Sequence, residues 1–168
     1  MIKAIVYTSE TGHTQRYAQM LGKDTWLPVY SLEEASSALA LGEEIFYLGW
    51  VMTGKVTGLA KAAKRYQVRG AAACGAYAPS AALTAQLRAN SGLNIPFFYL
   101  QGGVDYEKLR GLKLRMMRFM AKMTADQSKD KKLSAEEEEI LRTLRQGGDF
   151  VMAKNLEEIE AWLDGVKA

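Results

Sequence analysis

The chain has 168 residues, of which 48% are hydrophobic and 24% charged; this indicates one globular domain and excludes a disordered or fibrous protein. A single cysteine excludes an internal disulfide, and one cysteine with one histidine is too few for a zinc site of these ligands. The net charge of +3 is the sum of two parts of the chain with opposite charge. Segment 108–132 holds nine basic and two acidic residues, net +7, and the rest is net −4. The chain as a whole is therefore not a basic nucleic-acid-binding domain.

The beginning of the chain does not have the pattern of a targeting peptide. The apolar run 2–9 is followed at once by Glu10 and His13, without a small-residue cleavage site. No apolar run reaches the roughly 20 residues that a membrane-spanning helix needs. We expect a cytoplasmic protein that is at most peripheral to a membrane.

Strands and helices are predicted to alternate along the chain. The strands expected from buried apolar runs are Ile2–Tyr7, Ile45–Trp50, Val68–Ala76 and Ile95–Gln101, with a weaker one at Thr25–Val29. The expected helices are Thr14–Leu21, Leu32–Leu41, Thr57–Tyr66, Ser80–Asn90 and Asn155–Val166. In the last helix, Asn155 is the expected N-cap, and the expected apolar stripe is Ile159, Trp162, Leu163 and Val166.

This alternation predicts a single α/β domain over residues 1–168. The expected architecture is a doubly wound, five-stranded parallel sheet in the order 2-1-3-4-5. Ligands of such sheets bind beyond the carboxyl ends of the strands, at the point where the strand order reverses. The loops that follow the first, third, fourth and fifth strands, after Tyr7, Trp50, Ala76 and Leu100, are therefore where a site is expected.

The first of these loops, between the first strand and the first helix, has the composition of an anion cradle. Its residues are Thr8, Ser9, Glu10, Thr11, Gly12, His13 and Thr14. Hydroxyl groups and the free N–H groups of a helix N-terminus suit a phosphate monoester, whereas a P-loop would need Gly-Lys-Ser/Thr. The alternative is that the hydroxyls only cap the helix. We interpret His13, at the variable position of the pattern, as a surface residue.

Ser9-Glu10-Thr11-Gly12-His13-Thr14 resembles the flavodoxin phosphate loop, Ser/Thr-x-Thr-Gly-x-Thr. The resemblance implies a flavodoxin-like fold that binds flavin mononucleotide (FMN), with the FMN phosphate in this loop. It also implies that two later loops contact the flavin ring. These are Trp50, Val51, Met52, Thr53 and Gly54 after the third strand, and Gly75, Ala76, Tyr77 and Ala78 after the fourth.

Two residues of these later loops have alternative roles. Trp50 either stacks on the flavin or packs in the core at the end of its strand. Gly54 is a candidate for the peptide flip with which such loops respond to protonation of the flavin. The second loop departs from the family because the acidic Gly-x-Gly-Asp pattern is absent, and Cys74 before it is interpreted as a buried small residue rather than a nucleophile.

The basic segment is predicted to be an insert, about residues 105–148, after the fifth strand. A helix over Leu109–Met123 would carry an apolar face of Leu109, Leu112, Met116, Phe119, Met120 and Met123. Arg115, Arg118 and Lys122 would lie on the opposite side. Three interpretations fit: contact of 108–123 with an anionic membrane, docking of a partner, or packing on the domain itself. Ser134 and Glu137 predict a capping box for a second helix that ends at Gly147 and Gly148.

The ending Met-Arg-Phe-Met-Ala-Lys-Met of the basic helix, residues 117–123, is similar to the flavodoxin-like, quinone-coupled protoporphyrinogen oxidases. This resemblance implies an FMN-dependent oxidoreductase with a porphyrinogen or quinone substrate. The alternatives are a flavodoxin-type electron carrier that docks redox partners through the basic helix, and a fold that has lost its cofactor. No residue stands out as an acid, a base or a metal ligand, so no catalytic or metal-binding residue is assigned.

Overall fold

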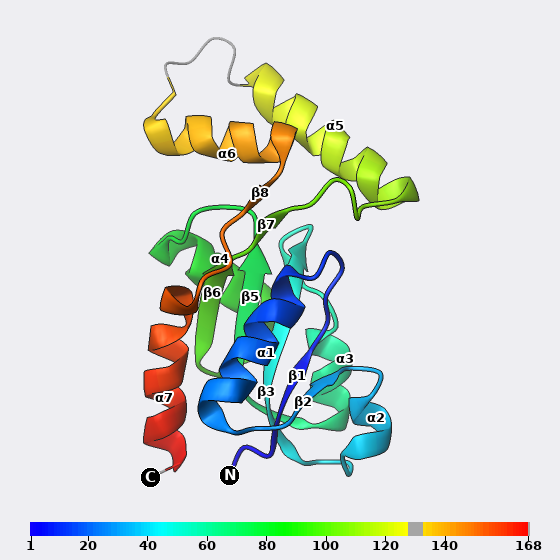
Figure 1. Cartoon of the computed structure of the whole chain (residues 1–168), viewed down its shortest axis with the longest axis vertical. Coiled ribbons are helices and arrows are strands. Elements are labelled where there is room, and N and C mark those ends of the chain that lie inside the picture. Colours follow the sequence, from blue (N-terminus) through cyan, green and yellow to red (C-terminus); the bar gives the residue numbers. More distant parts are fainter. Residues whose placement is uncertain (128–132, 168) are drawn as a thin grey trace.

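The structure, a computed structural model, describes residues 1–127 and 133–167. Its centre is a mostly parallel sheet with the strand order β2-β1-β3-β5-β6 (Figure 1). The parallel strands are β1 Ala4–Tyr7, β2 Val29–Ser31, β3 Glu44–Met52, β5 Gln67–Gly75 and β6 Phe97–Gln101. The prediction of an α/β domain with a parallel sheet is confirmed. The sheet also has a sixth strand that was not predicted, β4 (Lys55–Val56), which pairs antiparallel with β3.

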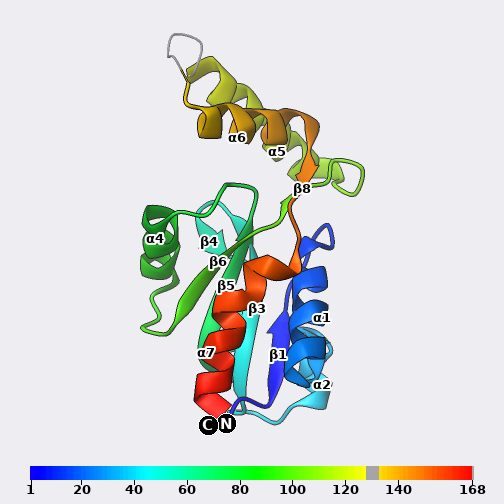
Figure 2. The ribbon, with the colours of Figure 1, turned by 60° about the vertical axis from the view of Figure 1, so that its left-hand side comes forward.

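Helices cover both faces of the sheet, as the views in Figures 1 and 2 show. One face carries α1 and α7 and the other carries α2, α3 and α4. Their bounds are α1 His13–Thr25, α2 Ala35–Ala38, α3 Leu59–Arg65, α4 Ala81–Ser91 and α7 Glu157–Lys167. A short 3-10 helix, η1 (Ala153–Leu156), precedes α7.

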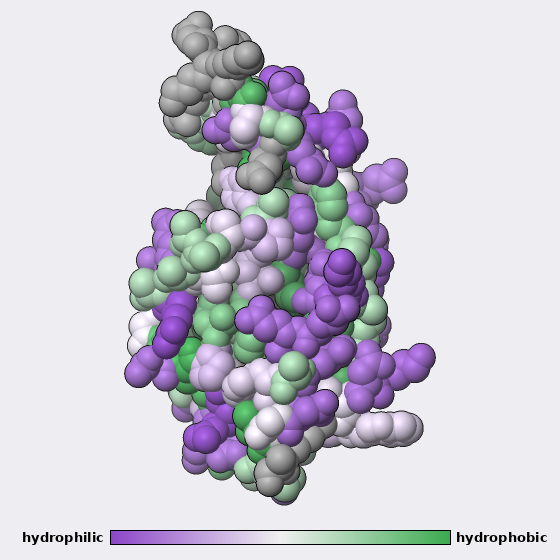
Figure 3. Space-filling model, turned by 90° about the vertical axis from the view of Figure 1, so that its left-hand side faces the viewer, coloured by the Kyte–Doolittle hydropathy of each residue, from purple (hydrophilic) through white to green (hydrophobic). Residues whose placement is uncertain are grey.

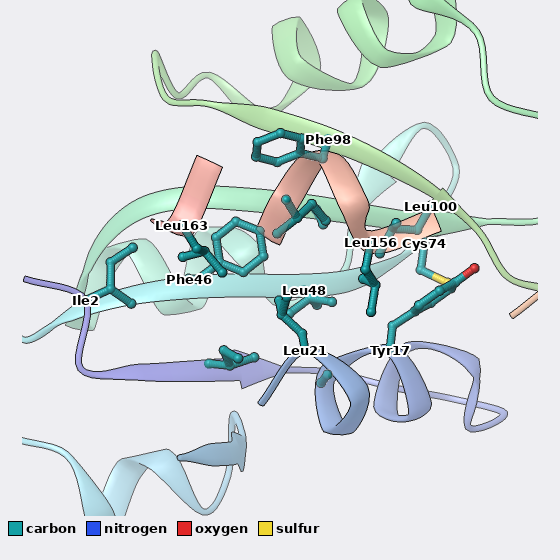
Figure 4. Packing of buried hydrophobic residues seen from close by; sticks show 14 residues of the cluster. Ile2, Tyr17, Leu21, Phe46, Leu48, Cys74, Phe98, Leu100, Leu156 and Leu163 are labelled. Atoms are coloured by element: carbon teal, nitrogen blue, oxygen red, sulfur yellow. The ribbon is translucent and has the colours of Figure 1, made fainter. Parts of the chain in front are cut away.

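Alternation along β3 divides the core into two clusters, one on each face of the sheet. Phe46 and Leu48 point to the face of α1 and α7, where they meet Tyr17 and Leu163 (Figure 4). Ile45 and Tyr47 point to the opposite face. A strand that is buried on both faces needs apolar residues at every position, and this explains the continuous apolar runs in the sequence.

Several predicted boundaries were wrong for local reasons. The predicted strand Thr25–Val29 begins only at Val29, because α1 continues to Thr25. The predicted helix Leu32–Leu41 shrinks to α2, because Ser31 and Glu34 hydrogen-bond each other's backbone N–H groups and hold a turn before it. Asn155 is not an N-cap: it lies in η1 and its side-chain amide donates to the Tyr17 hydroxyl at 2.6 Å and to the Phe150 carbonyl at 3.0 Å.

The insert is a helical hairpin that stands on a two-stranded neck. The neck is formed by β7 (Gly103–Val104) and β8 (Gly148–Asp149), which pair antiparallel. The hairpin consists of α5 (Gly111–Gln127) and α6 (Ala135–Gln146), and it lies beyond the carboxyl ends of the parallel strands (Figure 1). The predicted capping box of Ser134 and Glu137 is confirmed, as is the end of α6 at Gly147. The basic run 129–132 lies outside the described residues.

The predicted apolar stripe of the basic helix is divided between two environments: Leu109 and Met116 line the cavity described below, and other members are exposed. Among the side chains of α5 that the structure describes, Ala121 and Ala125 are buried, whereas Leu112, Phe119 and Met123 are 80%, 61% and 45% exposed. Small residues of the helix are thus buried, and three of the six residues of the predicted stripe face outward. The side chain of Met120 lies outside the described residues. The outward residues recur at intervals of four and seven, so they share one side of the helix.

Within residues 1–127 and 133–167, no helix is both long enough and apolar enough to cross a membrane.

Candidate functional site

One cavity of about 320 Å³ lies beyond the carboxyl ends of β1, β3 and β5. The predicted site residues that line it are Ser9, Glu10, Thr11, His13, Thr14, Trp50, Val51, Met52, Thr53, Gly54, Gly75, Ala76 and Tyr77. Thr8, Gly12 and Ala78 were also predicted but do not line it. Three loops that are far apart in the sequence thus meet in one place, because parallel strands bring their carboxyl ends to the same edge. The volume falls within the range of small-molecule and cofactor pockets.

The insert closes this cavity from the side opposite the sheet. Leu109, Met116, Met117 and Leu144 line it, together with Val104 and Asp105 of the neck region. None of these residues was predicted as part of the site. The loop after Leu100 was expected at this edge of the sheet, because it directly follows a parallel strand, but no residue of it or of the insert was assigned to the site.

The first loop leaves hydroxyl and amide groups at the start of α1. The N-cap position of α1 is Gly12, which has no side chain, so the alternative that a hydroxyl caps the helix at this position is disfavoured. The Ser9 hydroxyl oxygen accepts a hydrogen bond from the Gly12 N–H at 3.1 Å, which leaves the hydroxyl proton available for a ligand. Thr8 instead has a structural role, because its hydroxyl donates to the Thr57 carbonyl and accepts from Tyr47.

His13 is not the surface residue that was predicted. It is 8% exposed, lines the cavity, and its Nδ1 lies 2.9 Å from the Thr11 hydroxyl oxygen. Its Nε2 lies 3.9 Å from Oδ1 of Asp149, and the other carboxylate oxygen, Oδ2, accepts a 2.6 Å hydrogen bond from Arg16. Burial lowers the pKa of His13 from its ordinary value, with Asp149 acting in the opposite direction. This burial could not be predicted from the sequence pattern, since it depends on β8 returning to the start of α1.

Asp149 provides the negative charge on this side of the loop. Burial alone would raise the pKa of its carboxyl, but the hydrogen bonds from Arg16 and from the Val151 N–H hold that pKa below its usual value. The neck and the first loop are thus joined by an ion pair between Asp149 and Arg16. The geometry of the insert and the geometry of the candidate anion cradle therefore depend on each other.

Thr14 and Cys74 form the floor of the cavity. Both are nearly fully buried, and burial raises the pKa of the Cys74 thiol to about 12, with a hydrogen bond from Thr14 acting in the opposite direction. The interpretation of Cys74 as a buried small residue is confirmed. The Thr14 hydroxyl has a partner in this thiol, which was not predicted.

We expect the Cys74 thiol to be unreactive in the folded protein. A pKa of about 12 leaves almost no thiolate at pH 8, and the thiolate is the reactive form. A disulfide reagent such as Ellman's reagent should react with native protein at least on the order of 10³ more slowly than with protein in denaturant. Rapid reaction of the native protein would contradict the burial of this residue.

The second loop is a tight hairpin turn between β3 and β4. Thr53 and Gly54 are its two central residues, with φ angles of 48° and 73°, and Met52 pairs with Lys55 across it. Positive φ at both positions is the type I′ arrangement. The Asn90 side chain of α4 donates to the Gly54 carbonyl at 2.9 Å and holds the turn against the domain. Trp50 is only partly buried and lines the cavity, and its stacking on a ligand stays a prediction.

Replacement of Thr53 by asparagine should stabilise the fold. A β-branched side chain at positive φ is strained, while Asn-Gly is the preferred pair for a type I′ turn. The free energy of unfolding should rise by about 0.5–1 kcal/mol. Urea unfolding of Thr53→Asn beside the parent chain measures this difference, and a decrease would show that the turn is not strained as described.

The third loop is supported from behind by Tyr99 of β6. A Cβ atom on Gly75 would lie 2.6 Å from the Tyr99 hydroxyl oxygen, so a larger residue at this position would have to displace the Tyr99 side chain. The Tyr99 hydroxyl donates to the Tyr77 carbonyl at 2.9 Å, and burial raises its pKa. These contacts fix the backbone that presents Tyr77 to the cavity.

A second hollow lies at the edge of the sheet between α4 and β6. It is larger but more open, and most of its lining comes from α4, β6 and the loop that joins them. Figure 3 shows the face that carries α4 and α7, on which green apolar areas are small and separated by purple hydrophilic side chains. The enclosed cavity under the insert is the better candidate, because it combines apolar walls with converging polar groups.

In the part of the chain that the structure describes, no cluster of histidine, cysteine and carboxylate side chains could hold a metal ion. No protein-family model matches the chain, and no curated protein and no solved structure is significantly similar to it. The function is therefore inferred from the geometry of the cavity and its surroundings.

Proposed function

We propose that the protein is an FMN-binding oxidoreductase with a flavodoxin-like fold. The observation that carries this proposal is the convergence of three loops on one cavity: the hydroxyl-rich loop at the start of α1, the Trp50 turn and the Gly75–Tyr77 loop. These are the loops that the flavodoxin resemblance assigns to the phosphate and the two sides of the flavin ring. The order β2-β1-β3-β5-β6 supports it, because it places the reversal of strand order at this cavity.

The residues present fit FMN in chemistry and size. The donors around Ser9 and the N-terminus of α1 suit a phosphate. The cavity walls are largely apolar beyond this end, with Trp50, Tyr77 and the methionines of α5 available to a flat aromatic ring. When bound, FMN supplies the electron-transfer chemistry. The chain orients it through the two later loops and excludes water from it with the insert.

Substrate and acceptor are proposed from the second resemblance. In this proposal the protein acts like the menaquinone-dependent protoporphyrinogen oxidases of heme biosynthesis and passes electrons from a porphyrinogen through FMN to a quinone. The basic insert beside the cavity supports it, because exposed Arg115 and Arg118 offer charge partners for the carboxylates of a porphyrinogen.

The first test is the visible spectrum of the purified protein. A yellow protein that releases FMN on denaturation, or an apoprotein that quenches FMN fluorescence on titration, supports the proposal. A colourless protein that does not bind added FMN would remove both flavin-based functions. An anaerobic assay with protoporphyrinogen and menadione then tests the reaction itself, in which the expected result is turnover above the uncatalysed background.

The alternative is an electron carrier that binds FMN but has no substrate of its own. The observation in its favour is the outward face of α5, which is free for docking within the described part of the chain. A carrier would exchange electrons with a reductase but would leave protoporphyrinogen unchanged in the same assay. That result would reject the oxidase and retain the flavoprotein.

The outward face of α5 supports a peripheral contact with an anionic membrane, where a quinone would be reached from the cytoplasm. Leu112, Phe119 and Met123 are exposed along one side of the helix. Arg115 and Lys122 are exposed beside them, on one flank of this stripe. Apolar residues with basic neighbours are the composition of helices that lie in the membrane interface and contact anionic lipid.

Replacement of Phe119 by serine should weaken binding to vesicles that contain anionic lipid by about tenfold or more, since it removes one large side chain from the apolar interface. Co-sedimentation measures the effect, and the thermal midpoint should stay unchanged because Phe119 is exposed. Trp26→Ser is the matched control, because Trp26 is 92% exposed at the end of α1, away from the insert. Equal loss in both variants, or none in Phe119→Ser, would reject this docking face.

A further inference from the structure

We propose that the positive charge that balances the bound phosphate comes from outside the loop backbone: from Lys108 of the insert, and from His13, which takes up a proton when the phosphate binds. This inference rests on the proposed function, because it concerns the phosphate end of the same cavity. It adds two residues that the flavodoxin resemblance does not assign to phosphate charge. It also explains how a loop without lysine or arginine can hold a doubly charged group.

Lys108 lies directly over the candidate cradle. Its Nζ is 3.8 Å from the position that a Cβ atom on Gly12 would occupy. Asp105 lies 3.3 Å from the same Nζ and holds the ammonium group in place. An anion seated at the N-terminus of α1 would therefore lie within ion-pair distance of Lys108. The insert, and not the loop, provides this charge, which joins the basic segment of the sequence to the binding site.

The hydrogen bond between Thr11 and His13 determines whether Thr11 can donate to a ligand. If Nδ1 of His13 carries no proton, the Thr11 hydroxyl must donate to it, and the hydroxyl proton is used within the loop. If Nδ1 carries a proton, it donates to the Thr11 oxygen, and the hydroxyl proton is free for a phosphate oxygen. In the doubly protonated ring, Nδ1–H donates to the Thr11 oxygen, while Nε2 lies 3.9 Å from Oδ1 of Asp149. The protonated form thus makes the better phosphate site.

The surroundings of His13 decide which form is present before and after binding. The charged or titratable groups that face it are Asp149 of β8, Arg16 of α1, Asp105 and Lys108 at the start of the insert, and the Cys74 thiol next to Gly102. In the empty cavity, burial lowers the pKa of His13, so the ring is neutral near pH 7.5. A phosphate dianion near Thr11 adds a strong attraction for the imidazolium. One proton then moves from solvent to His13, and no other bond changes.

The pH dependence of affinity follows from this proton. The second pKa of a phosphate monoester is about 6, so FMN remains a dianion above pH 7. At pH values between the pKa of His13 in the free protein and its pKa in the complex, binding of each FMN is accompanied by the uptake of up to one proton from solvent. The dissociation constant for FMN should therefore increase as the pH rises above 7, by at most tenfold per pH unit. Riboflavin has the same ring without the phosphate, and its affinity should not change over this range.

Calorimetric titration of the apoprotein with FMN and with riboflavin tests both halves of the proposal. At pH 7.5, in two buffers of different ionisation enthalpy, FMN should bind with uptake of about 0.3–1 proton and riboflavin with none. In His13→Gln, whose amide can still donate to Thr11, the proton uptake should disappear. In Lys108→Gln, FMN affinity should fall about tenfold and riboflavin affinity should stay the same. Lys55→Gln, an exposed lysine on the β3–β4 hairpin, is the control and should change neither.

The outcomes separate this inference from the proposed function. FMN binding without proton uptake, or with equal affinity in the parent chain and Lys108→Gln, would overturn the inference and leave an FMN-binding protein. Equal affinity for FMN and riboflavin would also overturn it, because the phosphate would then lie outside the cradle. Failure of both ligands to bind would reject the proposed function itself.

Discussion

Replacement of Gly103 by alanine is expected to break the neck that carries the insert. Gly103 has a φ of 128°, which side-chain-bearing residues rarely adopt, and a Cβ atom there would lie 2.0 Å from the Gly148 carbonyl oxygen. The obstacle is backbone, so no side-chain rotation can relieve it. Strain and overpacking together should lower the free energy of unfolding by about 2–5 kcal/mol.

The same change should also open the cavity. Pairing of β7 with β8 holds Asp149 beside Arg16 and His13, and it holds Leu144 and Met117 over the loops. Separation of the two strands would release Asp149 from the first loop and would remove Leu144 and Met117 from the cavity wall. FMN affinity in Gly103→Ala should therefore fall by about tenfold or more, even at a temperature where the sheet domain stays folded. Urea unfolding followed by circular dichroism, and flavin fluorescence on the folded protein, measure the two effects.

Gly111→Ala is the matched control for this prediction. Gly111 also has a positive φ, 56°, at the start of α5, but nothing lies within 4 Å of its Cβ position. Only backbone strain remains, at about 1–2 kcal/mol, and the neck should stay paired. Equal effects of the two substitutions would mean that positive φ, rather than the Gly148 contact, decides stability here.

The sheet domain could be predicted from the sequence because burial on both faces leaves a direct signal. Residues Ala4, Ile5 and Val6 are completely buried, and so are Ile45 to Leu48, and each run is apolar without interruption. The four main strands were therefore located to within a few residues. Short or edge elements were located less well. β2 is a three-residue strand whose side chains are only partly buried, and its position depends on where α1 ends.

The loops of the candidate site could also be predicted, but their surroundings could not. Parallel topology brings loop positions together, whereas Asp149 reaches His13 only because the chain returns through β8 after the insert, residues 105–147. Helix α5 shows a different limit: it has apolar residues on two sides, and the sequence pattern favours the side with the larger residues. The structure instead packs Ala121 and Ala125 inward, because small residues let α5 and α6 approach closely.

Replacement of Phe46 by alanine should have the largest effect on stability of any single core change. Phe46 is completely buried in β3, and its ring lies 6.1 Å from that of Phe98 and 5.7 Å from that of Trp162. The substitution removes the centre of this aromatic group, and neighbouring β-strands cannot move together to fill the space. A loss of about 3–5 kcal/mol is expected, against a total stability of about 5–15 kcal/mol for a domain.

Phe119→Ala separates the loss of a buried ring from the loss of a phenylalanine as such. Phe119 is 61% exposed on the outward face of α5, so its removal should change the free energy of unfolding by less than about 0.5 kcal/mol. Phe46→Ala should shift the urea midpoint strongly while vesicle binding by the folded fraction is retained, and Phe119→Ala should do the reverse. Comparable destabilisation by both would mean that the outward face of α5 is covered in the folded protein, which would contradict its use as a membrane contact.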